Sequence, residues 1–162
     1  MPKAIEIATK IIKSDEESNI FKTKPYYCSE HYPTIGWGFR ILGTNQHDPL
    51  PDMTMTREEG DKKIDILIAG IYHGLCTHQD TATTFKRLSD VRQAVIISMC
   101  YQLGMARLLG FQKMWRALYL GDFNEAADQA LDSLAARQAV NRWHRNANAI
   151  RNDKLDTVYG VK

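Results

Sequence analysis

The segment YYCSEHYPTIGWG, residues 26–38, alternates aromatic and β-branched side chains with glycine and proline. This composition is typical of a short antiparallel sheet with tight turns. We expect the sheet to lie within about residues 21–51, where further aromatic residues and glycines occur. In a strand over residues 34–39, the even-numbered side chains would share one face and the odd-numbered side chains the other.

Helical patterns flank this segment on both sides. Apolar residues recur at helical spacing from about Lys3 to Glu16, and the chain after Pro51 has helical character throughout. Thr56 and Glu59 form the capping-box pattern, which predicts a helix that begins there and ends near Tyr72. The other predicted helices are 91–103, apolar nearly all round; 111–120, with Gly121 as a left-handed C-cap; one beginning at 122–125; and 140–151.

This order of elements predicts an α+β fold in one domain covering residues 1–162. A small lobe with hairpin strands would occupy about residues 14–55. A larger, all-helical lobe would comprise about residues 56–162 together with the N-terminal helix. Two such lobes leave a cleft between them, which is a common place for a ligand.

The composition excludes several classes of protein. A hydrophobic fraction of 44% and a charged fraction of 25% are ordinary for a globular domain and argue against a disordered, collagen-like or membrane protein. The 21 Lys and Arg balance 19 Asp and Glu, so charge does not indicate a nucleic-acid binder. The three cysteines (Cys28, Cys76 and Cys100) cannot all pair, which favours a reducing compartment. The N-terminus lacks the apolar core of a signal peptide.

Two charged clusters could carry chemistry. The run Asp15-Glu16-Glu17 ends the N-terminal helix, where the partial negative charge of the helix terminus disfavours acidic side chains. The run is either a solvated, frayed end or a carboxylate held at the junction of the lobes. Arg142 and Arg145 share one face of the last helix. This arginine pair is either solvated or hydrogen-bonds a buried carboxylate as a clamp.

The pattern His73-x-x-Cys76-x-His78 places three soft ligands close together. A zinc site needs four ligands, or three and a water, in a settled geometry. Because no fourth ligand occurs at a usual spacing, we expect no metal site.

Taken in order, these features resemble the phage-type lysozymes, or endolysins, the family that includes the T-even phage lysozyme. An acid at a helix end is followed by Tyr-x-Cys and, six residues after the cysteine, by Thr-Ile-Gly-x-Gly. Segments similar to the family's central and later helices are 91–104, 111–118, 123–127 and 141–151. The resemblance covers most of the chain at low identity, and it implies a lysozyme-like fold.

The resemblance implies catalytic roles for Glu16, Cys28 and Thr34. Glu16 rather than Glu17 matches the general acid, because the isoleucines at 11–12 then occupy buried positions of the family. Cys28 stands where the family usually has Asp and is also known with Cys. Substrate-binding positions implied in the same way are Tyr32, Gln102, Gln138 and Arg142, the last matching an arginine that hydrogen-bonds the catalytic Glu. The chain departs from the family at Glu17, which replaces a glycine, and at Phe39, which replaces a histidine.

The implied activity is hydrolysis of the β-1,4 bond between N-acetylmuramic acid and N-acetylglucosamine, without a metal or organic cofactor. Glu16 would protonate the leaving oxygen, for which we expect it to be partly desolvated. A neutral thiol is a poor electrostatic substitute for a carboxylate. We therefore favour a water guided by Cys28 and Thr34 over a covalent sugar adduct. The alternative for Cys28 is a small buried residue without a role.

The expected partner is bacterial peptidoglycan, bound by a monomer, and neither nucleic-acid binding nor membrane insertion is expected. Exposed basic residues would help the protein to settle on the wall: Arg137, Arg142, Arg145, Arg151 and Lys154. A bacteriolytic endolysin would accumulate in the host cytoplasm and reach the cell wall through a holin pore. Two rivals are a muralytic domain of a virion or tail protein and a degenerate module that only binds the wall. A nucleic-acid binder would leave residues 34–38 unexplained.

Overall fold

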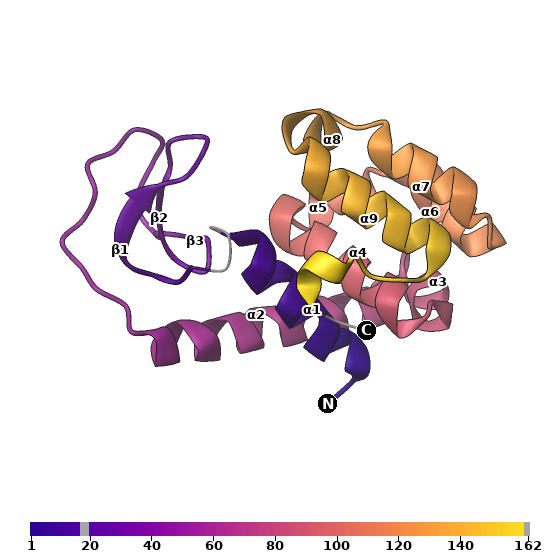
Figure 1. The fold of residues 1–162 in the computed structure, drawn as a ribbon, viewed down its shortest axis with the longest axis horizontal. Coiled ribbons are helices and arrows are strands. Elements are labelled where there is room, and N and C mark those ends of the chain that lie inside the picture. The colour runs from indigo at the N-terminus through magenta and orange to yellow at the C-terminus, as the bar shows by residue number, and fades with distance from the viewer. Residues whose placement is uncertain (17–19, 161–162) are drawn as a thin grey trace. The chain divides into compact units, whose positions relative to one another are not determined.

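The computed structural model describes residues 1–16 and 20–160 and has the predicted α+β fold (Figure 1). The chain divides into two compact units, Ile12–Leu67 and Met1–Ile11 with Ile68–Lys162. The division falls inside two helices, α1 (Lys3–Asp15) and α2 (Arg57–Thr77). Among the described residues, no helix combines the length and the apolar character that crossing a membrane requires.

Helix α1 has the predicted bounds to within one residue. Its apolar stripe is buried: Ile5, Ala8, Ile11 and Ile12 are each less than 10% exposed. Burial of this stripe stabilises the helix, because each fully buried isoleucine contributes about 1.5–3 kcal/mol. The helix ends at Asp15, so the following residue, Glu16, leaves it at its C-terminus.

The predicted sheet has three antiparallel strands in the order β1 (Lys22–Tyr27), β2 (Pro33–Gly36) and β3 (Phe39–Arg40). Thr34 pairs with Tyr26 on one side and with Arg40 on the other. The expected single strand over 34–39 is wrong, because the chain reverses between Gly36 and Phe39. Ile35 and Phe39 still share a face, but as cross-strand partners.

The reversal depends on Gly36 and Gly38, whose φ angles are +70° and +77°. L-residues with side chains rarely adopt such angles. A Cβ atom at Gly36 would also lie 2.8 Å from Cδ2 of Phe39. The two glycines of Thr-Ile-Gly-x-Gly therefore form the tight β2–β3 turn rather than the pleat of a strand.

Trp37 anchors this turn inside the unit Ile12–Leu67. Its ring is fully buried and lies edge-on to the ring of Phe21, with centroids 5.2 Å apart. Its Nε1 donates a 2.8 Å hydrogen bond to Oδ1 of Asp61, and Nζ of Lys13 lies 2.9 Å from the same oxygen. The turn is thus tied to both helices that enter the unit.

The capping box of α2 forms as predicted. Glu59 N donates to the hydroxyl of Thr56, and Thr56 N donates to the Glu59 carboxylate, both at 3.1 Å. These hydrogen bonds lower the pKa of Glu59. The helix continues to Thr77, five residues beyond the predicted end at Tyr72.

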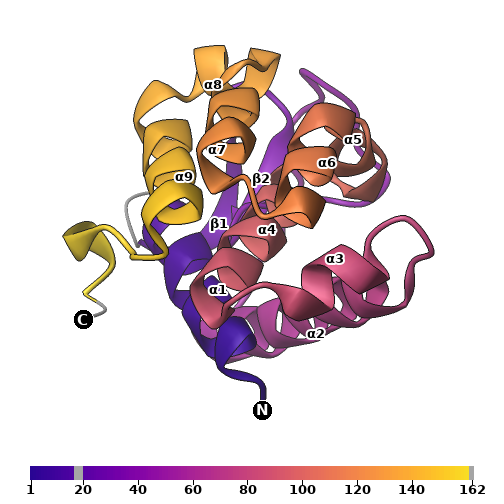
Figure 2. The same cartoon turned by 90° about the vertical axis from the view of Figure 1, so that its right-hand side faces the viewer.

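The other unit is helical, and α4 (Asp90–Leu103) forms its buried centre. Eight consecutive side chains of α4, residues 93–100, are buried, as its uniformly apolar sequence predicted. The further long helices also agree with the prediction: α6 (Gln112–Leu120), α7 (Phe123–Leu131) and α9 (Val140–Asn152). Helix α7 packs against both α6 and α9, and α9 packs on α4 (Figure 2).

Four short elements were not predicted: α3 (Ala82–Arg87), α5 (Met105–Leu109), α8 (Leu134–Gln138) and the 3-10 turn η2 (Thr157–Tyr159). Each spans two turns or fewer, which is too short to display a 3.6-residue period. The two predicted end signals are present, since Gly121 is a left-handed C-cap of α6 and Asp122 caps α7 through Glu125 N.

Candidate active site

The carbonyl oxygen of Tyr32 connects Cys28 with Thr34. It accepts a 3.1 Å hydrogen bond from Cys28 N and a 2.8 Å hydrogen bond from the Thr34 hydroxyl. The chain can make both bonds because β1 and β2 are joined by a short hairpin loop, whose turn is closed by His31 N donating to Cys28 O at 2.8 Å. The two predicted site residues of the sheet therefore share one backbone acceptor.

Cys28 and Thr34 differ in their exposure. Thr34 is only 3% exposed and lies in the middle of the three-stranded sheet. Cys28 follows the last residue of β1 and is a half-buried free cysteine. A buried hydroxyl that donates to a carbonyl retains its oxygen lone pairs as acceptors. Thr34 can thus orient a donor, and Cys28 can present its sulfur to a ligand.

Glu16 lies against the β2–β3 turn of the same unit. Its carboxylate carbon is 2.7 Å from the position that a Cβ atom at Gly38 would take. Only a glycine leaves room for this approach, and the carboxylate is half-buried. The structure thus places Glu16 beside one turn of the sheet that carries Cys28 and Thr34. Glu17, the alternative acid, lies outside the described residues.

The ring of Tyr32, predicted to bind substrate, lies under a cation. The guanidinium carbon of Arg40 is 3.6 Å from the ring centroid. Stacking of this kind fixes the orientation of an aromatic ring and places a positive charge over one of its faces. Sequence reasoning did not single out Arg40. No local pattern could have found it, because the contact depends on the reversal of the chain between β2 and β3.

The remaining predicted site residues belong to the helical unit. Gln102 is exposed near the end of α4, and Gln138 is exposed as the last residue of α8. Arg142 lies in the first turn of α9 and is half-buried, with Nε and Nη2 shielded from solvent. Two of its guanidinium nitrogens therefore lie away from solvent, and the clamp for a carboxylate stays a prediction.

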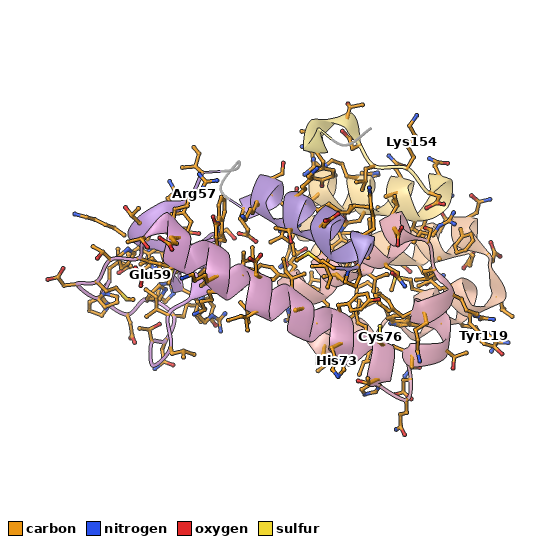
Figure 3. The ribbon with its side chains drawn as sticks, turned by 90° about the horizontal axis from the view of Figure 1, so that it is seen from below. Arg57, Glu59, His73, Cys76, Tyr119 and Lys154 are labelled. Carbon is orange, nitrogen blue, oxygen red and sulfur yellow. The ribbon has the colours of Figure 1, made fainter. Side chains whose placement is uncertain are left out.

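The other basic residues of the chain's end are partly engaged within the molecule. Arg151 forms a 2.9 Å ion pair with Asp128, and Arg145 donates a 3.0 Å hydrogen bond to the Tyr159 hydroxyl. Arg137 and Lys154 are exposed, and Figure 3 shows Lys154 extending from the molecule. The latter pair is therefore better placed to meet an anionic polymer.

His73, Cys76 and His78 do not combine into a metal site. Within residues 1–16 and 20–160, no group of three His, Cys, Asp or Glu side chains could hold a metal ion. Figure 3 shows His73 and Cys76 on the last turns of α2. Cys76 is hydrogen-bonded to Tyr72, and Nδ1 of His78 accepts a 3.0 Å hydrogen bond from Asp80 N.

A cavity of about 390 Å³ opens in the helical unit beside the beginning of α6. Its lining includes Phe111, Lys113, Gln129 and Asp132. None of the predicted site residues that the structure describes lines it.

Comparison with known proteins identifies the family of the chain. The sequence model of the family described as phage lysozyme matches residues 16–151, a range that begins at Glu16 and includes Cys28, Thr34 and Arg142. A similar protein is the pre-baseplate central spike protein Gp5 of Enterobacteria phage T4, which is 28% identical over 162 residues. The alignment covers 87% of this chain and 27% of that protein, so the chain spans about a quarter of its relative's length.

Proposed function

Because the chain belongs to the phage lysozyme family, we propose that it is a muramidase that degrades bacterial peptidoglycan. The bond cut is the β-1,4 linkage between N-acetylmuramic acid and N-acetylglucosamine. The observation that carries this proposal is that a small sheet carries Thr34 in β2 and Cys28 directly after β1, while an acid packs against its β2–β3 turn. Glu16 lies against the β2–β3 turn, while Cys28 and Thr34 bond to one carbonyl of the β1–β2 hairpin.

Glu16 is the proposed general acid. Cleavage of a glycosidic bond requires a proton for the leaving oxygen and stabilisation of an oxocarbenium-like centre. A carboxyl group delivers a proton near neutral pH only when its environment disfavours the charged form. The Glu16 carboxylate packs closely against Gly38 on one side, which is consistent with this role.

Thr34 is proposed to orient the attacking water. Its hydroxyl proton is committed to the Tyr32 carbonyl, so toward a ligand the oxygen acts as an acceptor. A water that donates one hydrogen to Thr34 turns a lone pair away from the sheet and toward the sugar. This arrangement favours direct attack by water, which inverts the anomeric configuration.

Cys28 is proposed to assist the same water from the position that carries Asp in most of the family. A neutral thiol provides a weak acceptor and donor rather than a full negative charge. The sulfur therefore guides the water more than it stabilises the oxocarbenium centre. Substrate contacts assigned on the family likeness are Tyr32, Gln102, Gln138 and Arg142.

Mass spectrometry of digested peptidoglycan tests the proposal. Purified protein is incubated with cell walls, and the released muropeptides are analysed before and after borohydride reduction. New reducing ends on N-acetylmuramic acid are expected. Anhydro ends would instead indicate a lytic transglycosylase, and the absence of new fragments would leave the wall-binding module. NMR of the new anomeric centre at early times, before mutarotation, distinguishes inversion from retention.

A virion role is the second candidate, because a similar protein is named as a central spike protein of a phage baseplate. The proposed chemistry is the same in both settings, whether the enzyme acts at entry or, as an endolysin released through a holin pore, at host lysis. Proteomics of purified virions separates the two. Detection of this chain in particles supports the entry role, and its restriction to lysates supports the endolysin.

A further inference from the structure

Two histidines connect the β1–β2 hairpin with the long loop after β3 (Figure 1). Nδ1 of His31 and Nδ1 of His47 lie 2.9 Å apart, and their ring centroids are 4.7 Å apart. Both residues are exposed. A hydrogen bond between two imidazole nitrogens requires one nitrogen that carries a proton and one that does not. The pair can therefore hold one proton between its rings, but not two.

The surrounding chain holds both histidines in unusual conformations. Their φ angles are +65° and +67°, a region that costs a non-glycine residue of order 1 kcal/mol and persists only where neighbours enforce it. His47 N donates a 2.9 Å hydrogen bond to His31 O. The ring of Tyr27 stacks on His31 with centroids 3.9 Å apart, and its hydroxyl donates to Asp48 O at 2.8 Å.

A second set of contacts continues the connection along both segments. Gln46 Nε2 donates a 2.7 Å hydrogen bond to Glu30 O, and Asn45 N donates a 2.8 Å hydrogen bond to the Asp48 carboxylate. Residues 45–48 therefore contact the turn of the β1–β2 hairpin through their backbone, an amide side chain and an imidazole ring. The bond between the two imidazoles is the contact among these that depends on histidine protonation.

The hairpin that residues 45–48 contact carries the candidate active-site residues Cys28 and Thr34. His31 N donates to Cys28 O, Cys28 N donates to Tyr32 O, and Tyr32 O also accepts from Thr34. Two consecutive hydrogen bonds thus lead from His31 through Cys28 to the carbonyl that fixes the Thr34 hydroxyl. A displacement of His31 is transmitted to the backbone of Cys28.

We propose that His31 and His47 are positioning residues that form a proton-sensitive clasp for the hairpin bearing Cys28 and Thr34. The clasp is closed while the rings share a single proton and opens when both imidazoles are protonated, since two facing N–H groups repel. Its consequence for catalysis rests on the proposed lysozyme function. The geometry of the clasp stands apart from that function and can be tested by itself.

Charged and titratable groups lie in the same segments as the histidine pair. Asp48 and Glu30 flank it in these two segments, and Tyr27 stacks on one ring. Cys28 lies at the other end of the hairpin turn, and Arg40 lies over Tyr32. The hydrogen bond between the imidazoles stabilises the loop at neutral and higher pH. This contribution is lost when acid protonates both rings, because neither Nδ1 can then accept the hydrogen bond.

NMR of the ¹⁵N-labelled wild-type protein tests the clasp without any substitution. At pH 7.5, one Nδ1 of the pair should carry a proton and the other should not, and at pH 5 both should carry one. Over the same change, exchange of the Cys28 and His31 amide protons, corrected for intrinsic pH dependence, should accelerate about two- to tenfold, as the loss of one hydrogen bond produces. Unchanged exchange would overturn the proposal.

His47→Asn is the informative variant, because asparagine tolerates a positive φ and does not titrate. It should remove the pH step in amide exchange and also the corresponding step in kcat for wall digestion, with KM little affected. His73→Asn, which replaces an exposed histidine on α2, should keep the wild-type steps. A His47→Asn protein that retains the exchange step excludes the clasp. If neither protein digests the wall, the lysozyme proposal fails, and the exchange data still decide the clasp.

Discussion

Glu16 is the residue on which the proposed chemistry depends most directly. Glu16→Gln keeps the shape of the side chain but removes its transferable proton. We expect the digestion rate to fall by about 10²- to 10⁴-fold, the usual contribution of a general acid, with an unchanged unfolding midpoint. The matched control is Glu6→Gln on the exposed face of α1, which should digest walls at the wild-type rate. Normal lysis by the Glu16 variant would refute the assignment.

The proposed role of Cys28 can also be tested by single substitutions. Cys28→Asp restores the residue that the family usually has and should retain substantial activity, whereas Cys28→Ala should lose most of it. The control is Cys76→Ala, which removes another half-buried free thiol. Rates of muropeptide release measure all three variants. Equal activity of the Ala and Asp variants would show that Cys28 only fills space and takes no part in catalysis.

Gly38 links a backbone conformation to the position of Glu16. Gly38→Ala introduces a Cβ atom that collides with the Glu16 carboxylate, and its φ of +77° adds a strain of about 1–3 kcal/mol. Gly43 also has a positive φ, +79°, but open space around its Cβ position. Urea unfolding should show destabilisation in both alanine variants, and digestion assays should show a loss of activity only for Gly38→Ala.

Helix α2 is tied to the β2–β3 turn through Asp61. Burial raises the pKa of this carboxyl, but the hydrogen bonds from Lys13 and Trp37 and the charges of Lys13 and Arg57 together lower it below its usual range. A carboxyl with a lowered pKa in the folded chain stabilises the fold above its unfolded pKa. This contribution is lost as the pH falls through the folded value.

Asp61→Asn should therefore destabilise the protein at pH 7, and its difference from the wild type should shrink as the pH falls below about 4. Urea unfolding at pH 7, 5 and 3 measures this difference. Asp65→Asn, an exposed position on the same helix, is the control and should follow the wild type at every pH. A constant difference for Asp61→Asn would show that ionisation of the carboxylate does not matter.

The molecule as a whole carries a formal charge of +2, and its basic residues are not equally available. Arg145 and Arg151 bond within the helical unit, while Arg137 and Lys154 are exposed. Replacing the exposed pair by glutamine should slow wall digestion several-fold at about 0.01 M salt and have little effect at about 0.15 M, where the Debye length is about 8 Å. A salt-independent loss would point to a direct contact instead of long-range attraction.

The longer helices and most of their ends were predictable because their signals are local. The buried stripe of α1, the capping box at Thr56 and Glu59, and the left-handed cap at Gly121 each involve residues a few positions apart. The end of α2 was misjudged by five residues because its last turns, with Tyr72 and Cys76, carry no strong stop signal.

For the candidate site, the sequence alone predicted the residue types and their order. The spacing from Cys28 to Thr34 and the acid at the end of a helix both involve residues that are close together in the chain. Only the folded chain showed that Gly36 and Gly38 reverse the strand, that Gly38 makes room for Glu16, and that His31 meets His47. Those contacts join segments up to about twenty residues apart, so no periodicity encodes them. They arise when sheet register and loop closure bring distant side chains together.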